Sequence, residues 1–327
     1  MGRRLAALFA SVATIVVVAA CSPAPSDETA TASSAAPQPR PQIAMITHQP
    51  PEDAFWDIVR RGAQDAANRD GVDLVYLHDP DPRAQAQMIS DSVGHHVAAI
   101  AVTLADPPAL TPAVKDAVAA GIPVVALNTG IDAWRALGVL SYFGQDDGGA
   151  GRAAGTRLAQ ERAHNILCVI QEGGHLGLKA RCDGAAATFG ASGGVVQQIV
   201  VDGTRPAEVK SAIVTRLQQD RGIDRVLTLS AAVSLIALQA AGEANSYAKV
   251  VTFDTSPAVI EAIKRGTIGW AIDQQPYLQG YLAVDSLSLY LSNKNVVGGG
   301  LPTLTGPAFV DESNVDTVAV RAQEGTR

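Results

Sequence analysis

Cysteine is scarce in this chain of 327 residues, and neither acidic nor basic side chains are in large excess. Three cysteines are too few for a small scaffold held together by disulfides. Hydrophobic residues make up 47% of the chain, which is enough for packed cores, and the length predicts two domains with a core each. The formal net charge is −7, from 25 basic and 32 acidic side chains. Because binding to DNA or RNA requires a basic surface, this balance argues against a nucleic-acid partner.

Long apolar runs are also rare. The apolar run near the N-terminus, residues 5–20, contains no charge and is shorter than the roughly 20 residues that a membrane-spanning helix needs. Arg3 and Arg4 precede it and small residues followed by Cys21 end it, which resembles a bacterial lipoprotein signal. The resemblance implies removal of residues 1–20 and lipid attachment to Cys21. The paired arginines suggest twin-arginine export, but residues 5–7 support it weakly, so general secretion is the favoured route. The mature protein would then be anchored at the outer face of the cell membrane.

Residues 21–41 have almost no large apolar side chains and consist mainly of serine, threonine, alanine, proline and glutamine. Such a composition cannot form a packed core. We expect a flexible tether between the lipid anchor and the folded body.

Beyond residue 41, short runs rich in β-branched residues alternate with alanine-rich segments of helical spacing. The alternation predicts an α/β fold with two doubly wound parallel sheets. Thr111 and Pro112 have the residue types of a helix N-cap and first turn, and Gly121 with Pro123 would end that helix. The predicted strands are residues 43–47, 72–77, 98–103, 123–127, 139–143, 166–170, 195–201, 226–229, 250–253 and 268–272.

Polar side chains follow the predicted strands, at the edge where parallel sheets bind ligands. Hydroxyl, amide and carboxylate groups can together satisfy a ligand with many hydroxyl groups. No pairing of nucleophile and base and no metal-ligand spacing occurs among them, which argues against an enzyme and against a metal site. These residues are Thr47, His48, Thr103, Asn128, Asp254 and Gln274.

Two adjacent aromatic residues, Phe55 and Trp56, begin the first predicted helix. A flat apolar ring can stack on the C–H face of a sugar while polar groups bind the sugar's edge. The alternative is that both rings belong to the core, but one helix face cannot readily bury two adjacent side chains.

Five segments resemble, in order within residues 43–310, the type I periplasmic sugar-binding proteins, which include the ribose-binding protein and serve ABC importers. The resemblance implies two similar lobes, residues 42–144 with 275–305 and residues 145–274 with 306–327, joined by three hinge crossings. A solute would be trapped between the lobes by hinge closure. The segments are residues 43–47, 54–56, 119–125, 251–254 and 271–276.

The same resemblance implies ligand-binding roles for Arg181, Asp254 and Gln274 in the second lobe, and for the Phe55–Trp56 pair in the first. A guanidinium group can hold two neighbouring hydroxyls from which a carboxylate accepts. Each polar residue has a simpler alternative: Asp254 as a helix cap, Arg181 as a solvated helix residue, and Gln274 as a hinge residue that bonds only backbone.

Asn128 and Thr129 depart from the ribose-binding pattern, which commonly has an aspartate and an arginine at these places. A neutral amide both donates and accepts hydrogen bonds, so the hydroxyl pattern bound here would differ. The loss of both charges predicts a neutral sugar or polyol rather than an acidic sugar.

Two glycine-rich motifs look like enzyme motifs but lack their context. Residues 190–194 fit G-x-S-x-G, yet a helix precedes and a strand follows them, the reverse of a nucleophile elbow. Residues 149–154 fit the dinucleotide fingerprint G-x-G-x-x-A, but Asp146 and Asp147 would repel a pyrophosphate there. A dinucleotide-dependent oxidoreductase is therefore the weaker alternative, and one of these two acids would instead cap a helix.

Two cysteines remain if Cys21 carries lipid: Cys168 on a predicted strand and Cys182 in the following helix. Export to an oxidising compartment predicts a disulfide between them if their Cα atoms lie within about 7 Å, and two buried thiols are the alternative. His95 and His96 have no third ligand nearby in sequence, so we assign no metal.

These patterns together predict a lipid-anchored, extracytoplasmic solute-binding protein of a carbohydrate ABC importer, which is not an enzyme and has no cofactor. Its partners would be a neutral sugar or polyol, the ABC permease subunits and the membrane. A sugar-sensing receptor for a signalling kinase would have the same cleft and a different docking surface. A transcriptional repressor of the same fold would need an N-terminal helix-turn-helix in place of the signal and tether.

Overall fold

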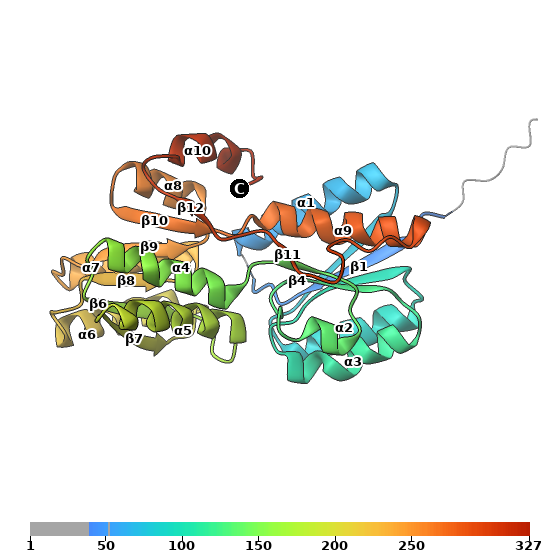
Figure 1. Ribbon diagram of the computed structural model, residues 1–327, viewed down its shortest axis with the longest axis horizontal. Coiled ribbons are helices and arrows are strands. Elements are labelled where there is room, and N and C mark those ends of the chain that lie inside the picture. Colours follow the sequence, from blue (N-terminus) through green and yellow to red (C-terminus); the bar gives the residue numbers. More distant parts are fainter. Residues whose placement is uncertain (1–38, 52) are drawn as a thin grey trace, which may run out of the picture. The chain divides into compact units, whose positions relative to one another are not determined.

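A computed structural model describes residues 39–51 and 53–327 (Figure 1). The predicted signal peptide, Cys21 and most of the predicted tether lie outside the described residues. From Arg40 to Arg327 the chain forms one compact unit. Among the described residues, none of the helices combines the length and the apolar composition that crossing a membrane requires.

Two six-stranded sheets form the framework. In spatial order the first contains β11 (Thr303–Leu304), β5 (Tyr142–Gly144), β4 (Val124–Asn128), β3 (Ala99–Thr103), β1 (Gln42–Thr47) and β2 (Asp73–His78). The second contains β12 (Ala308–Val310), β10 (Ile268–Asp273), β9 (Lys249–Phe253), β8 (Arg225–Thr228), β6 (Asn165–Ile170) and β7 (Val195–Val200). All neighbours run parallel except β10 and β12. The prediction of two doubly wound parallel sheets is confirmed.

Helices cover both faces of each sheet, and we call each sheet with its helices a lobe. On the first sheet, one face carries α1 (Ala54–Asp70) and α9 (Pro276–Asn293), and the other carries α2 (Pro82–Gly94), α3 (Pro107–Ala119) and the 3₁₀ helix Trp134–Leu137. On the second sheet, one face carries α4 (Asp147–Gln160) and α5 (Leu176–Ala191), and the other carries α6 (Pro206–Gln219), α7 (Ala231–Glu243), α8 (Pro257–Lys264) and α10 (Val315–Gln323).

Burial on both faces explains why the strands read as continuous apolar runs. In β6, Ile166, Cys168 and Ile170 pack toward α4 and α5, while Leu167 and Val169 pack toward the helices on the opposite face. Successive side chains of a strand point to opposite faces, so a doubly covered strand needs apolar residues at every position.

Glycines allow the paired helices to approach closely. Figure 1 shows α1 and α9 side by side. A Cβ atom at Gly280 of α9 would overlap the carbonyl oxygen of Val59 in α1, and one at Gly151 of α4 would overlap the carbonyl oxygen of Arg181 in α5. The fingerprint-like motif at residues 149–154 is thus a helix-packing surface.

The chain crosses between the lobes three times: between β5 and α4, between β10 and α9, and between β11 and β12. The crossings bond to one another. The backbone N–H of Thr305 donates to the carbonyl of Gly144 over 2.8 Å, and Nε2 of Gln275 donates to the carbonyl of Thr305 over 2.7 Å.

One predicted helix boundary is wrong. The helix expected to begin at Thr111 begins at Pro107, where the side chain of Asp106 accepts from the N–H of Ala109 over 3.1 Å. A carboxylate cap followed by prolines in the first turn is the stronger start signal, and Pro112 is accommodated inside the helix. The predicted end is confirmed, since the helix stops at Ala119 and Gly121 has a φ of +80°.

Candidate functional site

Arg181 lies buried on α5, with 4% of its surface exposed. Its Nε donates to Oδ1 of Asp147 over 2.7 Å, and its guanidinium carbon lies 4.9 Å from the ring centre of Phe253. The alternative of a solvated helix residue is therefore wrong. Asp146 caps α4 by accepting from the N–H of Gly149 over 2.8 Å, which leaves Asp147 to pair with the guanidinium.

A directed chain of side-chain amides connects the first sheet to the second. Nδ2 of Asn128, at the end of β4, donates to Oε1 of Gln274 over 3.2 Å. Nε2 of Gln274, just after β10, donates to Oδ1 of Asp254 over 2.7 Å. Two simpler alternatives fail here: Gln274 bonds through its side chain, and Ser256 rather than Asp254 caps α8 by accepting from the N–H of Val259 over 3.2 Å.

A second chain runs through two histidines. His48 follows β1, and both its backbone N–H and its Nδ1 lie within hydrogen-bond distance of Oγ1 of Thr103, at 3.1 and 2.8 Å. Its Nε2 lies 3.2 Å from Nε2 of His175, the N-cap residue of α5. Nδ1 of His175 accepts from the N–H of Leu178 over 3.2 Å.

The two predicted aromatic residues separate into different roles. Trp56 is 3% exposed and packs in the core beneath the first sheet, with its ring 4.8 Å from that of His48 and nearly perpendicular to it. Phe55 is half-buried, with its ring 5.2 Å from that of Trp56. One of the pair is thus a core residue that supports His48.

Thr47 does not join either chain. Its hydroxyl lies 3.1 Å from the hydroxyl of Tyr76 on the neighbouring strand, and that tyrosine donates to Oε1 of Gln49 over 2.9 Å. Thr47 therefore bonds within the first lobe. His48 and Thr103 belong to the histidine chain, Asn128, Gln274 and Asp254 belong to the amide chain, and Arg181 pairs separately with Asp147.

Burial suppresses negative charge at two acids near these groups. It raises the pKa of Asp254 to about 7, although Arg181 and the bond from Gln274 oppose the shift. It also raises the pKa of Glu172, in the loop after β6, to about 7, and nearby Asp53 adds to that shift. Both carboxyl groups are consequently protonated in part at neutral pH.

Burial keeps the two histidines neutral. It lowers the pKa of His175 to about 4 and the pKa of His48 well below its usual value, and the positive charge of Arg181 contributes to both shifts. Because Asp147 pairs with Arg181, the region holds donors and acceptors with little net charge.

Sequence reasoning missed three contributors: His175, the role of Asp147, and Gln279, whose Oε1 accepts from Nδ2 of Asn128 over 3.1 Å. His175 is 127 residues from His48 in sequence, and Gln279 is 151 residues from Asn128. The choice between Asp146 and Asp147 depends on one residue of helix register. No local pattern in the sequence signals any of the three.

His48, Glu172 and His175 bring three metal-ligand atoms within 4.8 Å of one another. Two imidazoles and a carboxylate suit Zn²⁺. The bond from the N–H of Leu178 to Nδ1 of His175, however, places the proton of the neutral ring on Nε2, which faces His48. Metal binding there would move this proton to Nδ1 and break the cap. The donors fit a hydrogen bond between the rings better than a metal ion.

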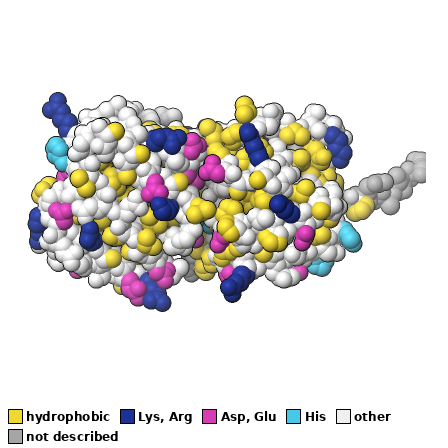
Figure 2. All heavy atoms as spheres, turned by 60° about the horizontal axis from the view of Figure 1, so that its bottom comes forward, with side chains coloured by type: hydrophobic (Ala, Val, Ile, Leu, Met, Phe, Trp, Pro, Cys, Tyr) yellow, Lys and Arg dark blue, Asp and Glu magenta, His cyan; other side chains and the backbone are white. Residues whose placement is uncertain are grey.

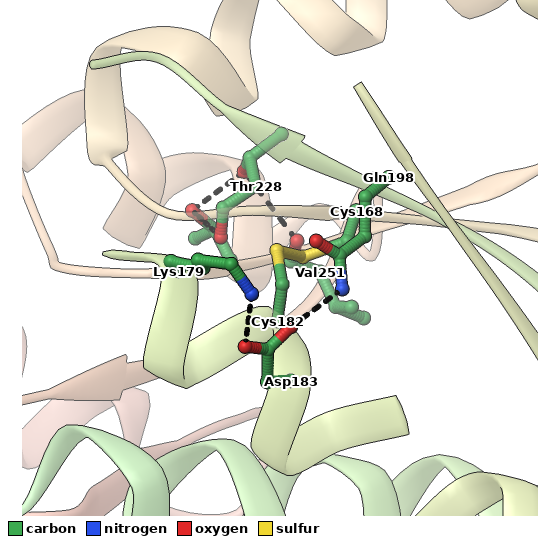
Figure 3. The surroundings of a disulfide bond; sticks show 8 residues. Cys168, Lys179, Cys182, Asp183, Gln198, Thr228 and Val251 are labelled. Atoms are coloured by element: carbon green, nitrogen blue, oxygen red, sulfur yellow. Dashed lines mark hydrogen bonds and ion pairs between the residues drawn. A yellow bond between two sulfur atoms is a disulfide. The ribbon is translucent and has the colours of Figure 1, made fainter. Parts of the chain in front are cut away.

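A disulfide holds the helix turn that carries Arg181. Figure 3 shows Cys168 of β6 bonded to Cys182 of α5, with their Cα atoms 6.0 Å apart. Oδ1 of Asp183 accepts from Nε2 of Gln198 on β7 over 3.0 Å. Because Arg181 directly precedes Cys182, both links fix the position of the guanidinium group relative to the second sheet.

The molecular surface offers less specific features. Two surface hollows of about 580 and 470 Å³ lie beside α4 and Phe309 and between β7 and α6, and the residues that line them belong to none of the bonded groups above. On the face of the described chain drawn in Figure 2, acidic and basic side chains are interspersed. The groups with coordinated hydrogen-bonding geometry are those at the strand ends.

Residues 43–295 match the family model of the periplasmic binding protein domain, so the chain belongs to this family. Membership implies a location outside the cytoplasm and a solute-binding role. The crystal structure of a carbohydrate transporter from Acidothermus cellulolyticus 11B, in complex with myo-inositol, superimposes with a TM-score of 0.86 and 50% identity, over 88% of this chain and 100% of that one.

Two curated relatives are more distant. The ribose import binding protein RbsB of Haemophilus influenzae is 28% identical over 257 residues, which are 75% of this chain and 84% of that protein. The xylose/arabinose-binding protein XylF of Sulfolobus acidocaldarius is 27% identical over 236 residues, or 66% of this chain. This second match spans only 57% of the relative's length.

Proposed function

We propose that this protein binds a neutral sugar or cyclic polyol between its lobes, with myo-inositol as the first candidate, and delivers it to the permease subunits of an ABC importer. The observation that carries the proposal is the meeting of strand-end groups from both sheets, Asn128 from the first with Gln274 and Asp254 from the second. The likeness to a myo-inositol complex at 50% identity supports the choice of ligand.

The mechanism follows from groups that both donate and accept. Ligand hydroxyls would exchange hydrogen bonds with Arg181, Asp254 and Asn128, which in this structure bond to Asp147 and Gln274. A ligand held from both lobes favours the closed state by its extra affinity for that state. An acidic sugar would bring an uncompensated charge next to Asp254 and the already paired Arg181, which is costly in a buried site.

Anchoring through Cys21 belongs to the same proposal and is supported by the lipoprotein-like sequence. A tether of residues 21–41 would let the body reach the permease while the lipid stays in the membrane.

Thermal-shift and calorimetric titration of the body from Arg40 onward tests the ligand class, since this part forms one compact unit. We expect myo-inositol to raise the melting temperature, because a ligand that binds only the folded form stabilises it by mass action. Ribose, xylose, arabinose and glucose define the range of neutral ligands, and glucuronate is the charged control. Binding of glucuronate with no response to neutral sugars or polyols would overturn the proposal.

A further inference from the structure

His48 and His175 meet across the two lobes. His48 follows β1 of the first lobe, and His175 caps α5 of the second. Their Nε2 atoms are 3.2 Å apart and their ring centres 5.0 Å apart, with the ring planes inclined by 68°. Both side chains are buried, so water competes little for this contact.

The bond from Leu178 to His175 sets the donor and acceptor at each later step of the histidine chain. The backbone N–H of Leu178 donates to Nδ1 of His175, so the neutral ring carries its proton on Nε2. That Nε2–H donates to Nε2 of His48, which therefore carries its own proton on Nδ1 and donates to Oγ1 of Thr103. Each step requires a neutral ring, since a second proton on either histidine would set two donors against each other.

We propose that His48 and His175 form a latch that holds the lobes together around the ligand, through one hydrogen bond within a chain that is intact only while both rings are neutral. The inference rests on the proposed function, because a latch affects binding only in a protein whose lobes open and close.

Charged groups from every neighbouring element bear on the latch. Arg181 of α5 disfavours a positive charge on either ring, whereas Asp147 of α4 favours one on His175 but is paired with that arginine. Glu172, in the loop before α5, has its charge suppressed by burial and by nearby Asp53. The balance leaves both imidazoles neutral in the latched state.

Separating the lobes would return the rings to water, where an imidazole has a pKa near 6.5. The pKa of His175 in the latched state is about 4, so closing the lobes below pH 6.5 must release its proton. The stabilisation from a neutral His175 is thus complete above pH 6.5 and is lost as the pH falls toward 4. Glu172 and Asp254 take up protons on closing and oppose this trend, so only a comparison between variants isolates the histidine.

Two substitutions separate the functions of His175. His175→Gln keeps an N–H donor of similar reach and does not titrate, while His175→Asn keeps a helix cap but is too short to reach His48. At pH 7.5 we expect H175N to bind myo-inositol about five- to tenfold more weakly than H175Q. Between pH 7.5 and 5.5 the wild-type Kd should rise about tenfold relative to the Kd of H175Q.

His164→Gln, at an exposed histidine of the second lobe, is the control and should follow wild type at both pH values. A ratio of the wild-type and H175Q dissociation constants that does not change with pH, or wild-type affinity in H175N at pH 7.5, would overturn the latch.

If wild type binds no sugar or polyol, the proposed function fails, and the ¹⁵N chemical shifts of the two imidazoles still test the latch. Fixed neutral tautomers at pH 5.5 support it, and titration of both rings near pH 6.5 refutes it.

Discussion

Asn128 donates its side-chain amide to Oε1 of Gln274 over 3.2 Å, which joins the end of β4 to the crossing after β10. The bond has one direction, because Gln274 uses its own Nε2 to donate to Asp254 and cannot reverse its amide without opposing two oxygens. Asn128 also has a φ of +68°, a conformation that asparagine tolerates better than most residues.

Replacing Asn128 with aspartate should therefore destabilise the protein. Asn128→Asp removes the donor and places a carboxylate against the oxygens of Gln274 and Gln279. We expect the free energy of unfolding to fall by about 1–3 kcal/mol at pH 7.5, as measured by urea denaturation. Asn245→Asp makes the same change at an exposed residue that also has positive φ, and should cost less than about 0.5 kcal/mol. Equal midpoints for the two variants would contradict this account.

Arg181 should matter for both stability and binding. Arg181→Met leaves Asp147 buried without its partner, which should cost about 3–5 kcal/mol of unfolding free energy. Arg181→Lys keeps the charge but loses the planar pair of donors, so it should weaken myo-inositol binding at least tenfold with a smaller effect on stability. Calorimetry and urea denaturation measure the two effects separately.

Arg152→Ala is the matched control, since this arginine is exposed and contacts Asp146 at 3.4 Å. A surface pair of this kind contributes at most about 1 kcal/mol. If R181K bound the ligand as tightly as R152A, the assignment of Arg181 to the ligand would be wrong.

The disulfide should stabilise the second lobe. The bond between Cys168 and Cys182 closes a loop with a sequence separation of 14, for which chain entropy predicts about 3 kcal/mol. We expect the double variant C168A/C182A to unfold at a lower urea concentration by this amount. Adding a reductant should destabilise the wild-type protein and leave the double variant unchanged. An equal response of both proteins to the reductant would show that the bond is absent in solution.

Asp254 should make the stability depend on pH with a negative slope. Burial raises its pKa from 3.8 to about 7, so between these values the folded state holds a proton that the unfolded state has lost. This stabilisation is complete below pH 3.8 and is lost as the pH rises through 7. Relative to Asp254→Asn, wild type should lose about 2.5 kcal/mol of unfolding free energy between pH 5 and pH 8.

Urea denaturation at both pH values measures this difference. Asp116→Asn, at an exposed carboxyl group of α3, should retain the wild-type dependence on pH. Parallel curves for wild type and D254N would contradict a buried, partly protonated Asp254.

The strands were predictable because burial on both faces imposes an unbroken apolar pattern, as in residues 166–170 of β6. The α/β class followed from the alternation of such runs with helical segments. Helix starts were less certain where several cap candidates compete, and Asp106 prevailed over Thr111. These outcomes depend on local chemistry, which a sequence displays directly.

Candidate site residues were predictable at strand ends and, for Arg181 on α5, from the family resemblance. Arg181 and Asp254 could be located from the sequence, but their partners depend on how α4 packs on α5 and how β9 lies beside β10. His175 could not be found, because its contact with His48 spans 127 residues and joins two separate sheets. Contacts between the lobes depend on how the three crossings position one lobe against the other. No short stretch of sequence specifies this arrangement.

The glycine at position 151 has a consequence for interpreting any mutational scan. Every side chain larger than hydrogen would push α4 away from the backbone of Arg181, so loss of binding in such variants would look like the loss of a ligand contact. A scan that scores only sugar uptake would class Gly151 with the ligand-binding residues, although its role is to set the distance at which a neighbouring helix holds one of them.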